Sequence, residues 1–378
     1  MKTYKIITLG ASGSGKTVFL ASMFKSLSIQ GNYTFFLDVE DQTKRKRLNS
    51  IYTQVVTGDR WPRGTTYSDV SEWTFNCRVK IPTLETYTAC QFTYFDYAGG
   101  RLTDSEEDPE FENLIQQAST ILGLLDGQKI YSLMKGDSNI AVSSFMKKDL
   151  PNILKWMHKC RVPIHFVISK WDLIEDEFSL RQVREQLLEI SEFEELIRLR
   201  NQLNSPVRLI PVSSIGPGFA SPQTDGSMRK ISGAVPRPFQ VEAPLACVLP
   251  DGLKARLSEL KEKEQEIEKT KKGKSRLFSN VLNFVGRAAQ ASLEFTRIFI
   301  VPVEFEFAPA IISKLIGSGL ENYQKASLER AEKLKQERDD SLKLVKDEET
   351  ALTNAVDNFV LIQNKLEHDF PDSDLILA

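Results

Sequence analysis

The sequence lacks an excess of charge of either sign. Its 378 residues include 49 basic and 51 acidic side chains, so the formal net charge is −2. A nearly neutral chain has no global attraction for nucleic acid or for an anionic membrane surface, and any such contact has to be local. We therefore expect no nucleic-acid partner.

Cysteine is scarce, and long apolar runs are missing. The four cysteines, Cys77, Cys90, Cys160 and Cys247, form no C-x-x-C pair, so neither a disulfide framework nor a zinc site is predicted. The N-terminal residues lack the apolar core of a signal peptide, and no uninterrupted apolar run is long enough to span a bilayer. The expected location is a reducing cytoplasm.

The most informative stretch is GASGSGKT, from Gly10 to Thr17, which fits G-x-x-x-x-G-K-[ST] at every defined position. Its glycines allow the backbone to turn successive N–H groups toward one anion, and the following helix adds partial positive charge. A polyphosphate is therefore the predicted ligand. Lys16 is expected to reach the β- and γ-phosphates, and the Thr17 hydroxyl to ligate a bridging Mg²⁺. The predicted phosphate contacts are Gly10, Ser12, Gly13, Ser14, Gly15, Lys16, Thr17 and Val18.

Strand and helix patterns alternate along the chain after this loop. Strands are predicted at 33–39, 72–81, 87–95, 121–126, 162–168 and 207–212, and helices at 41–56, 149–160 and 179–204. The runs 72–81 and 87–95 are typical of an antiparallel hairpin. The alternation predicts an α/β fold, a P-loop G domain whose mostly parallel sheet has helices on both faces. The Gly-, Pro- and Ser-rich stretch 216–238 is expected to be a long, mobile loop.

The composition changes after residue 251. Dense charge over 254–274 and helically spaced leucines and valines over 323–368 predict two long helices that flank an apolar middle. We therefore expect a nucleotide-binding domain over 1–250 and a helical, coiled-coil-like domain over 251–378. A basic cluster at 271–276 precedes an apolar segment, 277–316. Packing of that segment on neighbouring helices is favoured over contact with a membrane, which stays an alternative.

Three further motifs follow the first in a fixed order. They are DYAG at Asp96–Gly99, SKWD at Ser169–Asp172 and SSI at Ser213–Ile215. Together with the phosphate loop, they resemble the ordered D-x-x-G, [NT]-K-x-D and S-A-x motifs of translation-factor-class P-loop GTPases. The long segment before DYAG, with its Trp-Pro-x-Gly-Thr loop, looks most like the bacterial double-GTPase group of multi-gene conflict systems.

The resemblance implies that the ligands are GTP or GDP with Mg²⁺. A carboxylate at Asp172 can accept from N1–H and from the 2-amino group of guanine, whereas adenine has no such donor pair. By the family pattern, Lys170 would lie along the base plane, and Ser213 and Ser214 would lie at the base, with the Ser214 backbone on the guanine oxygen. Ser169 departs from the usual Asn or Thr. If SKWD is only a helix cap, an ATPase remains the alternative.

The resemblance also assigns the metal and the hydrolytic step. Thr65 or Thr66 is the expected switch ligand of Mg²⁺, Asp96 its partner through a water, and Gly99 the sensor of the γ-phosphate. A Gln commonly follows D-x-x-G and orients water, but this chain has Gly100, so slow intrinsic hydrolysis is expected. Arg63 is either an arginine finger supplied in cis or an exposed loop residue.

The function predicted from these patterns is a GTP-hydrolysing switch. Its nucleotide state would alter how the C-terminal helices engage a protein partner or a second copy, in a setting such as a bacterial conflict system. Two alternatives remain: a dynamin-like GTPase that assembles or associates with membranes, and a scaffold that binds nucleotide without turnover.

Arg63→Ala separates the two interpretations of this arginine. If Arg63 is a finger, the substitution lowers single-turnover GTP hydrolysis by about 10³-fold while GTP still binds, because a finger stabilises charge that develops in the transition state. An unchanged rate with GTP bound would make Arg63 an ordinary loop residue. Arg60→Ala, in the same loop, is the control.

Overall fold

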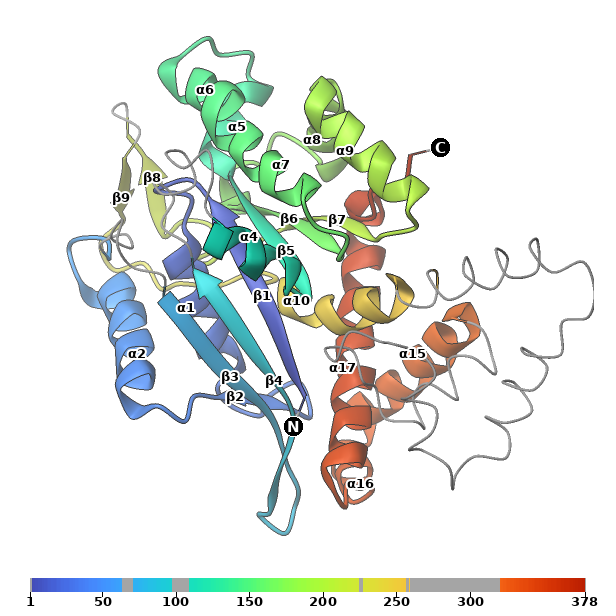
Figure 1. The fold of residues 1–378 in the computed structure, drawn as a ribbon. Coiled ribbons are helices and arrows are strands. Elements are labelled where there is room, and N and C mark those ends of the chain that lie inside the picture. The colour runs from blue at the N-terminus through green and yellow to red at the C-terminus, as the bar shows by residue number, and fades with distance from the viewer. Residues whose placement is uncertain are drawn as a thin grey trace, which may run out of the picture.

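The computed structural model describes residues 2–62, 71–96, 109–223, 227–255, 258 and 320–377. Its main sheet has seven strands in the order β2-β3-β4-β1-β5-β6-β7 (Figure 1). Pairing is parallel from β4 through β1, β5 and β6 to β7, and antiparallel between β2, β3 and β4. The strands are β1 Thr3–Gly10, β2 Phe36–Asp38, β3 Ser71–Lys80, β4 Thr86–Asp96, β5 Thr120–Asp126, β6 Ile164–Ser169 and β7 Val207–Pro211. The predicted α/β class and the β3–β4 hairpin are confirmed.

Helices follow the strands along the chain. Before residue 250 they are α1 Lys16–Leu27, α2 Gln42–Thr57, α4 Pro109–Gln116, α5 Gly127–Met134, α6 Ile140–Ser144, α7 Leu150–His158, α8 Leu180–Leu188, α9 Ser191–Gln202 and α10 Ala243–Ala246. After it come α15 Leu320–Gln336, α16 Arg338–Leu342 and α17 Glu348–Asp369. Three short helices are Phe145–Asp149, Trp171–Leu173 and Pro371–Ser373, and residues 248–255 are also helical. No described helix is both long enough and apolar enough to cross a membrane.

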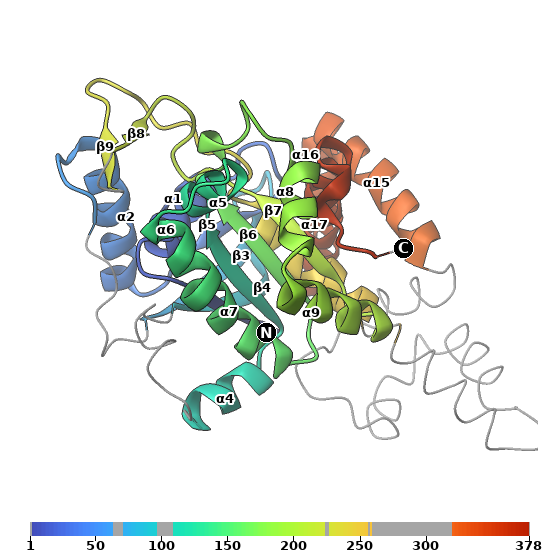
Figure 2. The same cartoon turned by 90° about the horizontal axis from the view of Figure 1, so that it is seen from above.

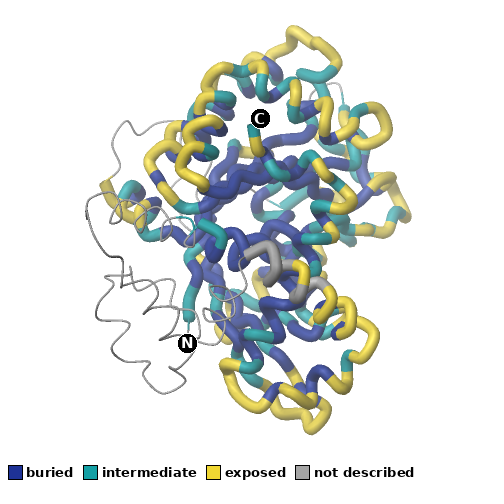
Figure 3. The backbone as a smooth tube through the Cα atoms, turned by 90° about the vertical axis from the view of Figure 1, so that its right-hand side faces the viewer, coloured by how far each residue is buried: buried dark blue, intermediate teal, exposed yellow. Residues whose placement is uncertain are grey.

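The sheet separates two hydrophobic cores. In β1, Tyr4 and Ile6 pack into one core, and Ile7 and Leu9 pack into the other, as the two-residue period of a strand requires. Helices α1, α10 and α17 supply the first core, and α4, α5, α7, α8 and α9 supply the second (Figure 2). Buried residues therefore run through the strands, while exposed residues gather on the outer faces of helices and in turns (Figure 3). The prediction of helices on both faces is confirmed.

Two predicted long helices are each broken. The pattern over 179–204 forms α8 and α9, with Ile190 extended between them (φ −85°, ψ 112°). This break lets both Leu187 and Phe193 reach full burial in the second core, which one straight helix would not achieve. The pattern over 323–368 is divided among α15, α16 and α17. Helix α17 begins separately because Asp347 and Thr350 form a capping box at its N-terminus. The helical period of the sequence correctly predicted helices, but it did not show where tertiary packing interrupts them.

Two other predictions need correction. The strand predicted over 33–39 is only Phe36–Asp38, because β2 pairs only with Asn76–Arg78 of β3. The predicted loop 216–238 contains a hairpin, β8 Ala220–Pro222 with β9 Met228–Lys230. Phe219 and Met228 of this stretch pack in an apolar cluster with Trp61, so burial holds it in place. The charged and apolar segments over 259–319 lie outside the described residues.

A buried ionic cluster joins the C-terminal helices to the sheet. The Asp251 carboxylate accepts from Arg208 Nε at 2.5 Å and Arg208 Nη2 at 2.8 Å, and His165 Nε2 lies at 2.9 Å. Gln363 Nε2 of α17 donates to it at 2.9 Å. Although burial alone would raise the pKa of Asp251, the Arg208 charge and the hydrogen bonds hold it below its usual range. Helix α17 therefore shares a core with β6 and β7 and donates a hydrogen bond to the carboxylate that pairs with Arg208 of β7; the boundary predicted at residue 250 stays a prediction.

Asp251→Asn should lower the free energy of unfolding by about 3–5 kcal/mol, because it leaves the buried Arg208 charge without its counterion. Chemical denaturation at neutral pH measures the loss. Glu367→Gln is the matched control: Glu367 also pairs with Arg208, at 2.9 Å, but is 38% exposed, so its loss should cost far less. Folding lowers the pKa of Asp251, so the ionised carboxylate stabilises the folded protein fully at pH values above the usual aspartate pKa. This stabilisation decreases as the pH falls below that value. Equal costs for the two variants would contradict this account.

Candidate functional site

The carboxyl ends of the five parallel strands meet at one edge of the sheet. Thr8 of β1 is in register with Asp96 of β4, and Asp126 of β5 is in register with Ser169 of β6. Neighbours β4 and β5 lie on opposite sides of β1, so the strand order reverses there. In open α/β sheets, ligands bind outside the carboxyl ends of the strands at such a point. The motifs at Gly10, Asp96, Ser169 and Ser213 all follow strands that end at this edge.

The Gly10–Thr17 loop takes a backbone path that requires glycine. Gly13 (φ +84°) and Gly15 (φ +91°) lie in the left-handed region, which side chains with a Cβ rarely adopt. A Cβ on Gly10 would lie 2.9 Å from Ser14 Oγ and 3.0 Å from the Leu124 carbonyl oxygen. The loop is therefore packed closely against β5 at its start.

The residue at the N-cap of α1, Gly15, forms no side-chain cap. The first hydrogen bond of α1 runs from Phe19 N to Gly15 O at 2.8 Å, so the N–H groups of Lys16, Thr17 and Val18 have no acceptor within the helix. The first turn contains no acidic residue. The positive end of the helix dipole thus faces the loop with N–H groups that have no acceptor within the helix, an arrangement that suits an anion.

Lys16 is the buried cation of this loop. Its side chain folds back so that Nζ donates to the carbonyl oxygens of Gly10 at 2.8 Å and Ala11 at 3.2 Å. Burial lowers the pKa of Lys16, and the nearby charge of Asp96 opposes that shift. Two backbone carbonyls are weaker partners for an ammonium group than a phosphate would be.

Thr17 and Asp96 meet beside Lys16. The Thr17 hydroxyl lies 3.5 Å from Asp96 Oδ2, and Asp96 is buried. A hydroxyl and a carboxylate are oxygen donors of the kind that Mg²⁺ prefers. Within the described residues, no group of three or more His, Cys, Asp or Glu side chains could hold a metal. The Thr17 hydroxyl and the Asp96 carboxylate are thus the residues that could hold a magnesium ion at this point.

A second polar cluster lies at the ends of β5 and β6. Lys170 adopts a left-handed backbone conformation (φ 52°) and its Nζ forms an ion pair with Asp126 Oδ1 at 2.8 Å. Ser169 Oγ donates to the Leu125 carbonyl oxygen at 3.1 Å. Ser169 therefore links β6 to β5 by a hydrogen bond, although the GTPase motif that SKWD resembles commonly has Asn or Thr at this position.

Asp172 is oriented by the next motif in the sequence. Ser213 Oγ donates to Asp172 Oδ1 at 2.5 Å and accepts from the Gly216 amide at 2.8 Å. Burial raises the pKa of Asp172, and the Ser213 hydrogen bond and the Lys170 charge oppose that shift. The adjacent Trp171, which is 2% exposed, anchors the turn in the second core. One carboxylate oxygen is thereby fixed while the side chain remains partly accessible.

The structure brings the predicted residues together in two groups. Lys16, Thr17 and Asp96 gather at β1 and β4, and Ser169–Asp172 gathers with Ser213 at β6 and β7. Ser12 is exposed, and Val18 and Ser214 are half-buried. The predicted roles of Arg63, Thr65, Thr66 and Gly99 lie outside the described residues.

Two positions that support the candidate site were missing from the sequence prediction. Asp126 is the partner of Lys170 and also caps α5 by accepting from Gln128 N. Gly127 lies so close to the next strand that a Cβ there would be 2.0 Å from the Ser169 carbonyl oxygen. The Asp-Gly pair at the end of a buried strand was the available signal.

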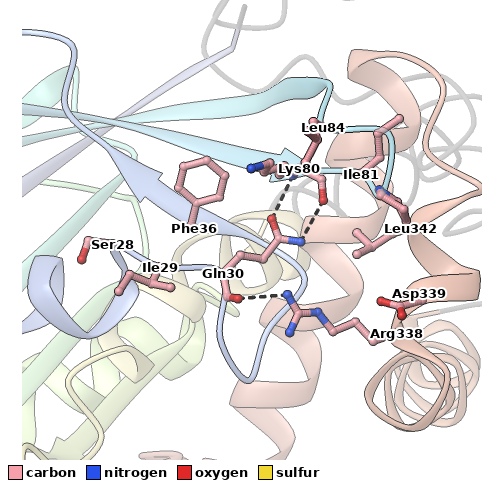
Figure 4. Close-up of a pocket in the computed structure, with 11 residues that line it drawn as sticks. Ser28, Ile29, Gln30, Phe36, Lys80, Ile81, Leu84, Arg338, Asp339 and Leu342 are labelled. Atoms are coloured by element: carbon pink, nitrogen blue, oxygen red, sulfur yellow. Dashed lines mark hydrogen bonds between the residues drawn. The ribbon is translucent and has the colours of Figure 1, made fainter.

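A cavity of about 530 Å³ lies at a different part of the molecule, between the end of α1, the tip of the β3–β4 hairpin and α16 (Figure 4). Gln30 and Arg338 line it, and Arg338 donates to the carbonyl oxygens of Gln30 and Gly31. None of the residues predicted to bind a ligand lines this cavity.

The sequence matches no protein-family model and none of the curated proteins. The interpretation of the site therefore rests on its geometry and on the chemistry of its residues.

Gly127→Ala should displace the Ser169–Asp172 turn, because the added methyl group meets a backbone carbonyl and not a flexible side chain. We expect a loss of about 1–3 kcal/mol in unfolding free energy, as for other overpacked positions. Gly136→Ala is the control for a glycine with open space around it, although its φ of +72° carries its own backbone cost. Thermal denaturation of both variants measures the difference. A smaller loss at 127 than at 136 would contradict the close approach.

Proposed function

We propose that this protein is a magnesium-dependent guanine-nucleotide-binding protein that hydrolyses GTP slowly. The single observation that carries the proposal is the placement of Asp172, held by Ser213, at the same sheet edge as the N-terminus of α1. The Asp172 carboxylate suits a purine base, and the N-terminus of α1 suits the phosphates of the same nucleotide. The order of the motifs also supports the resemblance to translation-factor-class GTPases.

The phosphate side of the proposal rests on α1 and Lys16. A polyphosphate would accept from the N–H groups at the start of α1, and Lys16 would exchange its two carbonyl partners for phosphate oxygens. Positive-φ backbone at Gly13 and Gly15 allows the loop to wrap closely around an anion. Each of these features has a direct use in phosphate binding.

The base side rests on the chemistry of a partly buried carboxylate. Ionised Asp172 can accept two hydrogen bonds from guanine, at N1–H and the 2-amino group. Adenine has no such pair of donors, so it would leave the charge without partners, at a cost greater than that of a lost neutral bond. Ser213 fixes the carboxylate before the base arrives, which reduces the ordering cost of binding.

Thr17 and Asp96 would hold Mg²⁺ against the phosphates. A bound Mg²⁺ would neutralise charge that develops on the phosphates during hydrolysis. The residues of this chain fit that task, because the hydroxyl and the carboxylate lie 3.5 Å apart beside Lys16. Arg63, Thr65 or Thr66, and Gly99 complete the hydrolytic set by the motif resemblance. Gly100 stands where a water-orienting Gln is common, so we propose slow turnover.

Helix α17 would transmit a structural change at the nucleotide site to a surface that binds a partner. It packs on β4, which ends at Asp96, and contacts β6 and β7 through Asp251. A change at the carboxyl ends of these strands would therefore act on the C-terminal helices. We propose that the helices engage a protein partner or a second copy in a nucleotide-dependent manner.

Nucleotide affinity with and without Asp172→Asn tests the function. The wild-type protein should bind GTP and GDP with Mg²⁺ more tightly than ATP. Asp172→Asn should weaken guanine binding by about 10- to 100-fold, since hydrogen bonds to a charged acceptor are lost. The variant should gain affinity for xanthine nucleotides, because an Asn amide can donate to the 2-oxygen that replaces the 2-amino group.

Asp176→Asn is the matched control, because it removes the same charge from an exposed position four residues away. It should leave the base preference unchanged. Equal binding of ATP and GTP by the wild type, or an unchanged preference in Asp172→Asn, would rule out the guanine-specific site.

A further inference from the structure

The end of α17 contacts the base side of the candidate site. Phe370, the first residue after α17, is half-buried, and its ring meets two other aromatic rings edge-on. The centroid of its ring is 6.1 Å from that of Trp171, at an interplanar angle of 85°, and 6.1 Å from that of Phe239, at 68°. Edge-to-face pairs at such distances attract each other beyond their buried area. Phe370 therefore joins two aromatic residues that lie far apart in the sequence.

Trp171 determines the position of the turn that carries Asp172. It is buried, and it stands between Lys170 and Asp172 in the sequence. Its amide donates to the Val212 carbonyl oxygen at 3.1 Å, and Val212 immediately precedes Ser213. A shift of the Trp171 ring would therefore move the carboxylate of the next residue.

Phe239 holds Ser213, the other half of the base-recognition motif. Phe239 N donates to Ser213 O at 2.7 Å, and Ser213 N donates to Phe239 O at 3.1 Å, so the two residues pair as an antiparallel bridge. The Ser213 hydroxyl in turn donates to Asp172 Oδ1. Phe370 thus contacts both the residue beside Asp172 and the backbone partner of Ser213. One ring supports both members of the hydrogen bond that orients the carboxylate.

The chain on either side of Phe370 is fixed to the rest of the protein. Before it, Gln363 of α17 donates to the carboxylate of the buried ionic cluster. After it, Leu375 N donates to the Val207 carbonyl oxygen of β7 at 2.9 Å, and Figures 1 and 2 both place the C-terminal end of α17 beside β7. Phe370 also packs against both hydrophobic cores. Its ring is therefore presented to the base side from a fixed backbone.

We propose that Phe370 is a positioning residue for recognition of the base. This inference rests on the proposed guanine-nucleotide function. By contacting Trp171 and Phe239 together, the ring keeps the Asp172 carboxylate and the Ser213 hydroxyl at hydrogen-bonding distance. Because Phe370 belongs to the end of α17, docking of this end favours binding of the base, and binding of the base favours docking by the same factor.

The test compares affinities for GDP and for inosine diphosphate, which lacks the 2-amino donor. The wild-type protein should bind GDP more tightly by about 10-fold or more, because the missing group leaves one bond to a charged acceptor unmade. Phe370→Leu keeps an apolar side chain but removes both edge contacts. It should lower this ratio by about 5-fold, since a displaced carboxylate loses more with a base that offers two donors.

Phe359→Leu is the matched control on the same helix. The Phe359 ring also makes two edge contacts, with Phe35 at 4.9 Å and Phe92 at 5.9 Å, but neither partner adjoins the base-recognition motif. Because Phe359 is fully buried, its substitution should reduce stability at least as much as Phe370→Leu does. It should leave the ratio of GDP to inosine diphosphate affinity at the wild-type value. Circular dichroism at the assay temperature checks that each variant is folded.

Phe239→Leu, alone and combined with Phe370→Leu, tests the contact itself. The single substitution should also lower the affinity ratio. The double variant should fall little below the lower of the two single variants, because both substitutions remove the same contact. Losses that multiply in the double variant would overturn the role of this ring pair.

The linkage also predicts an effect of the base on the end of α17. At saturating nucleotide, GDP should slow hydrogen exchange in peptides covering residues 370–377 more than inosine diphosphate does, and Phe370→Leu should abolish that difference. Equal protection by the two nucleotides in the wild type would overturn the linkage.

The outcomes separate this inference from the proposed function. If the wild type binds no guanine nucleotide, both are overturned. If it prefers GDP but Phe370→Leu retains the wild-type ratio, only the positioning role is overturned. A uniform loss of affinity for both nucleotides, with the ratio retained, would also overturn it and leave Phe370 a merely structural residue.

Discussion

The parallel pairing of β1 with β4 on one side and β5 on the other determines where the candidate functional groups lie. It brings Thr8 level with Asp96 and sets the glycine loop at the point where the strand order reverses. Pairing onward to β6 and β7 adds the Ser169–Asp172 turn and Ser213 to the same edge. Without this register, residues separated by more than 150 positions would not form one site.

The two ends of the site are built on different physical principles. At α1, the N–H groups of the first helical turn and a buried lysine create a positive region whose shape depends on glycine. At Asp172, a carboxylate held by a hydroxyl creates a negative, directional region. A purine nucleotide has negative phosphates and a base edge with donors, so the opposite signs of the two ends complement the two ends of that ligand.

The connections beyond the site determine how it can respond. Asp251 links β6 and β7 to α17, and Met228 and Lys230 of the segment 216–238 hold Trp61 and the end of α2. Both connections bring together residues that are far apart in the sequence, and both include a buried or half-buried charge with specified partners. Such groups tolerate few alternative arrangements, since an unpaired charge away from water is costly.

The sequence by itself determined the local features. Spacing and composition predicted the glycine loop, the β3–β4 hairpin, the alternation of strands with helices and the motifs at Asp96, Ser169 and Ser213, because these depend on backbone freedom and on periodic burial. Only the tertiary structure decided the Lys170–Asp126 ion pair, the break at Ile190, the packing of α17 on the sheet and the contacts of Lys230. Each of these depends on which distant surfaces meet, and no local pattern records that choice.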